Sequence, residues 1–129
     1  MTIPDHIVAA LARGTRSVLV CGGRSYRDVK TVNVVLDAID LKAPIALVMQ
    51  GAATGADECA RAWAARRAVA CLSVPADWGR LGRAAGPLRN QRMLDDWSPS
   101  VVVAFPGGAG TADMVRRARS GRVPVLEVS

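Results

Sequence analysis

Aromatic side chains are scarce in this sequence of 129 residues. Tyr26 is the only tyrosine and Phe105 the only phenylalanine, beside three tryptophans. Proteins that bind single-stranded nucleic acid without sequence preference combine a basic groove with aromatic side chains on which the bases stack. Basic residues are plentiful here, but they never form a run longer than a pair. The composition therefore argues against an aromatic stacking platform for a single strand.

Cysteine and histidine are also rare. Cys21, Cys59 and Cys71 are odd in number and far apart, they form no C-x-x-C pair, and His6 is the only histidine. This pattern favours reduced cysteines buried in the core over a disulfide, a metal site or a nucleophile. We expect His6 at the surface, and we predict neither a bound metal nor a required cofactor.

Long hydrophobic runs are missing. No apolar run approaches the roughly 18 residues that suggest a membrane span, and the N-terminus shows no basic stretch followed by an apolar one. We therefore expect a cytoplasmic protein with no membrane contact. A chain of this length buries roughly two thirds of its unfolded surface. That is enough for one domain, residues 1–129, without disulfides or metal.

Acidic residues are outnumbered. Seventeen lysines and arginines against eleven acidic residues give a net charge of +6, and fifteen of the seventeen are arginines. Such a balance favours an acidic partner. A small phosphorylated ligand satisfies this charge with fewer demands than a nucleic acid does.

Apolar runs alternate with amphipathic segments along the whole chain. A parallel, doubly wound sheet of five strands follows from that alternation, which makes the fold class α/β. A polar, glycine-containing segment, 75–86, interrupts the pattern, and Pro87 is expected at the first position of the helix that follows. Helices are predicted at about 5–12 (a short leading helix within 1–15), 29–41, 56–68, 87–97 and 111–120, and strands at 17–21, 45–50, 69–74, 101–105 and 123–128.

Glycines gather where three of the predicted strands end. The segments are CGGRSYRD at 21–28, QGAATGAD at 50–57 and FPGGAGTAD at 105–113, below called the first, second and third turns. In open α/β sheets, ligands bind outside the carboxyl ends of the strands, where the strand order reverses. We therefore expect one shared binding site. If the first and fourth strands are neighbours, Gly22–Gly23 and Gly107–Gly110 face each other across it.

Two common phosphate motifs are excluded. A Walker loop needs a lysine and a Ser or Thr after its last glycine, and the second turn offers Ala56 and Asp57 there. The dinucleotide fingerprint GxGxxG is broken in the first turn, and in the third turn Asp113 stands where the last glycine belongs. ATP hydrolysis of the Walker type and a standard NAD dehydrogenase are both disfavoured.

The three turns, together with AGPLRNQRM at 85–93, resemble the SLOG superfamily. Within it the chain is similar to the small single-domain branch related to YspA and cpYpsA, over about residues 18–125. The resemblance implies a Rossmann-like fold that binds nucleotides or nucleotide-derived ligands as a homo-oligomer, a dimer or a tetramer. Relatives include predicted sensors, the DprA proteins that bind single-stranded DNA, and LOG or lysine-decarboxylase-like enzymes that release a base from a nucleoside monophosphate.

The sequence departs from the enzymatic relatives at two positions. Their PGGxGTxxE motif ends in a glutamate, and Met114 stands at that position here. Their RKxxM-type segment is matched by Arg89, whereas Asn90 replaces the lysine. Asp113 is next to the glutamate position, but one helical step rotates a side chain by about 100°. Arg89 and Asp113 are the catalytic candidates, and Asp57 or Asp28 are possible sources of a carboxylate from another wall.

The favoured function is that of a sensor or a ligand-binding module. Amides of the third turn and the Thr111 hydroxyl would hold a phosphate that Arg24 and Arg89 neutralise, and the second turn would receive the sugar. Thr111 could instead cap its own helix, Tyr26 could stack on a base or close its loop, and Trp78 could be a wall, a lid or core. The alternatives are a nucleoside-monophosphate N-glycosidase and, less favoured, DprA-like DNA binding. The predicted ligand-binding residues are Gly22, Gly23, Arg24, Tyr26, Gly51, Ala52, Thr54, Gly55, Asp57, Arg89, Asn90, Pro106, Gly107, Gly108, Gly110 and Thr111.

Overall fold

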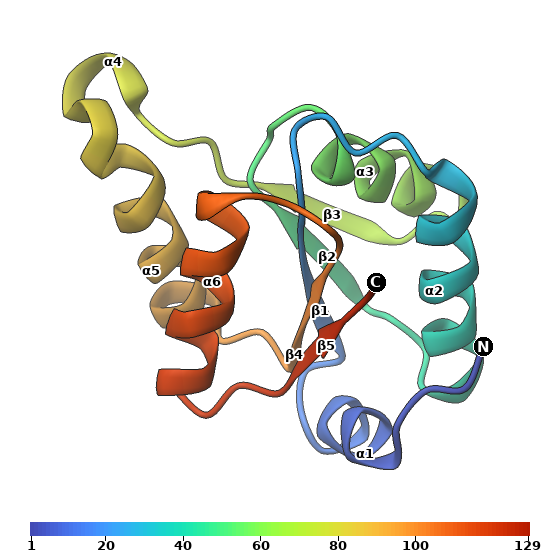
Figure 1. The fold of residues 1–129 in the computed structure, drawn as a ribbon. Coiled ribbons are helices and arrows are strands. Elements are labelled where there is room, and N and C mark those ends of the chain that lie inside the picture. The colour runs from blue at the N-terminus through green and yellow to red at the C-terminus, as the bar shows by residue number, and fades with distance from the viewer.

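A computed structural model describes residues 1–129 as a five-stranded parallel sheet with helices on both faces (Figure 1). The strand order is β3-β2-β1-β4-β5. All strands are parallel, and the direction in which successive strands are added to the sheet reverses between β1 and β4. The predicted α/β class and doubly wound parallel sheet are thereby confirmed. The strands are β1 (Ser17–Cys21), β2 (Leu47–Gln50), β3 (Ala70–Ser73), β4 (Val101–Ala104) and β5 (Val125–Glu127).

The helices divide between the two faces according to the alternation of side chains along the strands. Val18 and Val20 of β1 pack in the core shared with α1, α2 and α3, whereas Leu19 points to the opposite face, toward α5 and α6. The first core holds 21 buried residues and the second only 7, so the face under α5 and α6 is the thinner one. The helices are α1 (Asp5–Arg13), α2 (Val29–Lys42), α3 (Ala56–Arg66), α4 (Trp78–Leu81), α5 (Ala85–Trp97) and α6 (Ala109–Ser120).

The segment 75–86 departs most from the sequence prediction. It contains the short helix α4 and a 3-10 turn, Gly82–Ala84, and Figure 1 shows α4 projecting from the body of the protein. Helix α5 begins at Ala85, so Pro87 is its third residue and not its first. The proline is tolerated because the first amides of a helix have no partner inside it.

The start of α6 also differs from the prediction, and this boundary matters for the site. Helix α6 begins at Ala109, two residues before the predicted start, so Gly110 and Thr111 lie in its first turn.

Cys59 is buried and Cys21 partly buried, as expected, but Cys71 is exposed. It lies on β3, and the sequence does not show that this strand is at the edge of the sheet. His6 is exposed, as predicted. The helices are too short or too polar for any of them to cross a bilayer.

Candidate functional site

The three glycine turns meet at the carboxyl edge of the sheet and hydrogen bond to one another. The Gly23 amide donates to the Pro106 carbonyl at 2.9 Å, and the Ala56 amide donates to the Gly23 carbonyl at 3.1 Å. The Thr54 hydroxyl donates to the Arg24 carbonyl at 2.9 Å. β1 and β4 are neighbouring strands, which is what the predicted facing of the first and third turns required. The first turn is the centre of this contact.

Two glycines are required by the contacts between turns. Gly55 has a φ of +78°, and a Cβ built on it would lie 2.1 Å from the Gly23 carbonyl oxygen. A Cβ on Gly107 would lie 2.7 Å from the Gly23 amide nitrogen and still closer to the Thr111 hydroxyl. These glycines allow backbone to approach backbone. Their role in the structure is to join the turns.

A cavity of about 790 Å³ opens beside the joined turns, between the start of α6 and the segment that carries α4 and α5. Its volume is toward the upper end of the range of small-molecule sites, ~300–1,000 Å³. The structure places part of the predicted site in its wall. These residues are Gly22, Gly23, Arg24, Gly51, Asp57, Arg89, Asn90, Gly108, Gly110, Thr111 and Asp113.

The remaining predicted residues lie outside the lining. The Tyr26 ring packs on Phe105, with ring centroids 5.6 Å apart, and contacts the first core. The sequence left open whether Trp78 is a wall, a lid or core, and the structure places it in the lining. Arg83 and Arg116, two exposed residues of the lining, were not predicted. No motif includes these two arginines, so only the fold assigns them. The predicted residues outside the lining are Tyr26, Ala52, Thr54, Gly55, Pro106 and Gly107.

The N-terminus of α6 supplies the cavity with free amides. The Ala109, Gly110 and Thr111 amides donate to no group of the protein, and Gly108, the N-cap, has no side chain to accept from them. Unpaired amides and the positive end of the helix dipole favour an anion at this position. The Thr111 hydroxyl accepts no hydrogen bond from a backbone amide of α6, so it does not cap the helix.

Arg89 is fixed in the opposite wall. Its Nη1 donates to the carbonyls of Gly51 (2.8 Å) and Val74 (3.1 Å), and its Nε donates to Asn90 Oδ1 at 3.0 Å. Nη2 has no partner in the protein. Burial lowers the pKa of Arg89, an effect that the nearby Asp57 carboxylate opposes. A guanidinium that is already oriented and keeps one nitrogen free is suited to binding an oxyanion.

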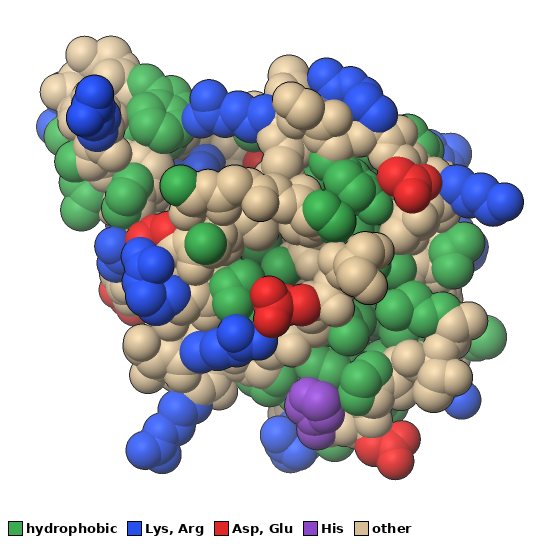
Figure 2. Space-filling model, viewed as in Figure 1, with side chains coloured by type: hydrophobic (Ala, Val, Ile, Leu, Met, Phe, Trp, Pro, Cys, Tyr) green, Lys and Arg blue, Asp and Glu red, His purple; other side chains and the backbone are tan.

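Arginines outnumber carboxylates around the cavity. Arg24, Arg83, Arg89 and Arg116 line it, against two aspartates. Figure 2 shows Lys and Arg side chains along the upper part of the molecule, above the carboxyl ends of the strands. The wall therefore carries a positive potential that attracts anions.

Asp57 closes the second turn from within the cavity wall. One carboxylate oxygen, Oδ2, accepts from the Gly51 amide at 3.0 Å and the Ala53 amide at 3.2 Å, and Oδ1 accepts no hydrogen bond from the protein. Burial raises the pKa of Asp57, although these amides and Arg89 counteract it. A buried carboxyl with a raised pKa and one free oxygen is able to exchange a proton or to accept from a hydroxyl.

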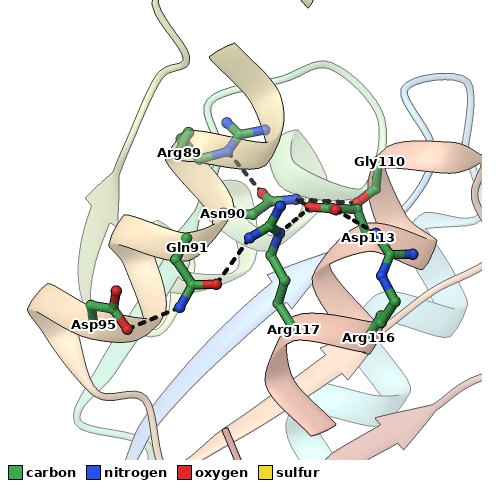
Figure 3. A network of polar contacts seen from close by, with 8 residues as sticks. All are labelled: Arg89, Asn90, Gln91, Asp95, Gly110, Asp113, Arg116 and Arg117. Carbon is green, nitrogen blue, oxygen red and sulfur yellow. Dashed lines mark hydrogen bonds and ion pairs between the residues drawn. The ribbon is translucent and has the colours of Figure 1, made fainter. Parts of the chain in front are cut away.

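Asp113 is engaged on both oxygens in a network that joins α5 to α6 (Figure 3). It accepts from Asn90 Nδ2 (3.0 Å), Arg116 Nη2 (2.7 Å) and Arg117 Nε (2.9 Å). Burial alone would raise the pKa of Asp113, but the bonds from Asn90 and Arg117 and the two arginine charges lower it. Met114, at the position of the glutamate, is 1% exposed in the second core. Asp113 is thus an ionised link between helices.

This network predicts an acid-dependent contribution to stability. Because the pKa of Asp113 is lowered on folding, its stabilisation is present above the unfolded value of about 3.9 and is lost as pH falls through the folded value. We expect Asp113→Asn to be about 2 kcal/mol less stable than the wild type at pH 7. Urea unfolding at pH 7, 5 and 3 should show the gap narrowing at the lowest pH. Asp95→Asn, at an exposed residue of α5, is the control, and a gap independent of pH would contradict the assignment.

The cavity offers neither a thiolate nor a cluster of three metal-ligating side chains. Burial raises the pKa of Cys21, which ends β1 on the cavity floor, to about 12, so the thiol stays protonated at neutral pH. No three His, Cys, Asp or Glu side chains are placed together to hold a metal ion. The polar chemistry of the cavity therefore comes from amides, guanidinium groups and two carboxylates.

A family model describes the first half of this arrangement. The model of the YspA, cpYpsA-related SLOG family (YAcAr) matches residues 16–81, which is 66 of the 129 residues. The chain belongs to this SLOG family. No curated protein and no solved structure shows significant similarity to the chain. The SLOG match runs from β1 to α4 and includes the first and second turns, and it confirms the resemblance predicted from the motifs.

Proposed function

We propose that this SLOG protein is a ligand-binding module for a nucleotide or a nucleotide-derived molecule. The observation that carries the proposal is the set of unpaired amides at Ala109, Gly110 and Thr111, which open onto a cavity lined by arginines. A phosphate placed there accepts from the amides and meets the positive end of α6. Arg89, held by two carbonyls, and Arg24 neutralise its charge.

The second turn suits the sugar. The free oxygen of Asp57 is an acceptor for a ribose hydroxyl, and the Gly51 Cα lies beside Arg89 without a side chain to fill the space. A carboxylate beside a guanidinium distinguishes a phosphorylated sugar from a simple anion. In this arrangement the protein holds the ligand by its phosphate and its ribose.

Ligand-induced stabilisation tests the proposal. AMP, ADP-ribose, NAD and cyclic nucleotides are added at millimolar concentration, and the midpoint of thermal unfolding is recorded. A ligand at a hundred times its Kd stabilises the folded state by ~2.7 kcal/mol, which we expect to raise Tm by roughly 10 °C in a domain of this size. The absence of a shift with every compound would contradict the proposal.

The geometry of Asp57 supports a second candidate function, that of a nucleoside-monophosphate N-glycosidase. Asp57 is the lining carboxylate that has an oxygen free, whereas both oxygens of Asp113 are engaged. Asp28, the other carboxylate considered, caps α2 through Thr31 outside the cavity. Chromatography of a nucleotide panel would detect a released base. Loss of release in Asp57→Asn, with turnover retained in Asp113→Asn, would assign the chemistry to Asp57.

A further inference from the structure

Trp78 holds an unusual position above the cavity. It is the only aromatic residue of the lining, yet 47% of the residue is exposed to solvent. The ring lies against Gly86, where a built Cβ would be 2.9 Å from the indole edge. One edge of the indole is thus supported by the start of α5, and the ring is not part of either core. A tryptophan at this place exposes apolar surface to the cavity.

The Arg24 guanidinium lies over the Trp78 ring. Its central carbon is 5.1 Å from the ring centroid, within the range of a cation–π contact. Such a contact at an exposed site is weak, so a flat ligand group competes with it easily. Arg24 comes from the first turn and Trp78 from α4, so this contact joins two segments of the cavity lining.

We propose that Trp78 stacks on the aromatic base of the ligand, and that the base displaces Arg24 from the indole. This inference rests on the proposed function. The ligand class is then a nucleotide with an intact base, and not a sugar phosphate. Arg24, once released, turns to the phosphate at the start of α6. Tyr26, the other aromatic considered from the sequence, is packed on Phe105 and lies outside the lining.

Calorimetric titration of AMP and of ribose 5-phosphate separates base stacking from phosphate binding. We expect the wild type to bind AMP roughly tenfold or more tightly than ribose 5-phosphate, because stacking on an aromatic side chain adds substantially to the binding affinity whatever the base. Trp78→Leu should lower the AMP affinity to that of ribose 5-phosphate and leave the latter unchanged. Trp78→Phe should restore most of the difference.

Trp97→Leu is the matched control. Trp97 is exposed to a similar extent, 49%, and lies at the end of α5 away from the lining. Its replacement should change neither affinity. Equal affinities of the wild type for the two ligands, or an equal loss of both in Trp78→Leu, would overturn the stacking role while phosphate binding stands. Binding of neither ligand by the wild type would overturn this inference, whereas the proposed function would be overturned only if ADP-ribose, NAD and the cyclic nucleotides also failed to bind.

Discussion

Replacing Gly55 with alanine should lower the free energy of unfolding by about 3 kcal/mol or more. The residue has a φ of +78°, which side chains rarely adopt, and such backbone strain costs about 1–3 kcal/mol. The new Cβ would also lie 2.1 Å from the Gly23 carbonyl oxygen and 2.6 Å from the Arg24 carbonyl carbon. Both are backbone atoms of the first turn, so relief requires the turns to separate, at a further cost of about 1–3 kcal/mol.

Urea or thermal unfolding measures the effect, and Gly79→Ala is its control. Gly79 lies in α4 with nothing within 4 Å of a built Cβ, so its replacement should change stability by less than about 0.5 kcal/mol. The contrast separates the combined effect of the strained φ and the contact between turns from the general effect of replacing a glycine. If Gly55→Ala proved as stable as Gly79→Ala, the first and second turns would not be joined as described.

Arg89→Met should weaken nucleotide binding by about a hundredfold. Hydrogen bonds to charged groups contribute about 1.5–3 kcal/mol, and a loss of ~2.7 kcal/mol corresponds to a factor of 100 in Kd. The guanidinium is positioned before the ligand arrives, since Gly51, Val74 and Asn90 hold three of its donor bonds. The expected loss should appear in calorimetric titration of AMP.

Two further variants separate the position of the charge from its presence. Arg92→Met removes a guanidinium from the same helix, but one that is 77% exposed and paired with Asp96, so binding should remain at the wild-type level. Gly51→Ala retains Arg89 but builds a Cβ much closer to its Nη1 than van der Waals contact allows, which forces the guanidinium to move. We expect much of the Arg89→Met loss from Gly51→Ala as well. Equal binding by Arg92→Met and Arg89→Met would show that only net charge matters.

Strand ends and glycine spacing were sufficient to predict where the candidate site lies. Parallel strands bring their carboxyl ends to one edge, so the three turns had to meet there once the order of β1 and β4 was known. Arg89 and Asn90 were predicted instead from the segment AGPLRNQRM and its resemblance to the family, and the structure places both in the network of Figure 3. Periodicity also located α2 and α3 to within a few residues.

What the sequence did not reveal depends on contacts between distant segments. Glycines that touch a ligand and glycines that touch another turn have the same sequence signature, so Gly55 and Gly107 were grouped with Gly108 and Gly110. Trp78 lies in a polar segment without periodicity, and only the fold places it over the cavity. The pairs from Asp113 to Arg116 and Arg117, in contrast, have i,i+3 and i,i+4 spacing and were open to prediction.

Because α4 projects from the body of the protein, the segment that carries Trp78 is separate from the contacts that join the turns. The hydrogen bonds that join the turns involve Gly23, Ala56 and Pro106, and none of them comes from the segment 75–84. Around Gly79 a built Cβ meets no atom within 4 Å, so this part of the segment has room to vary. Substitutions there are expected to alter which base fits over the cavity while the proposed phosphate site and the sheet are unaffected. The same scaffold is therefore open to evolving new ligand preferences through one exposed segment, at little risk to its folding.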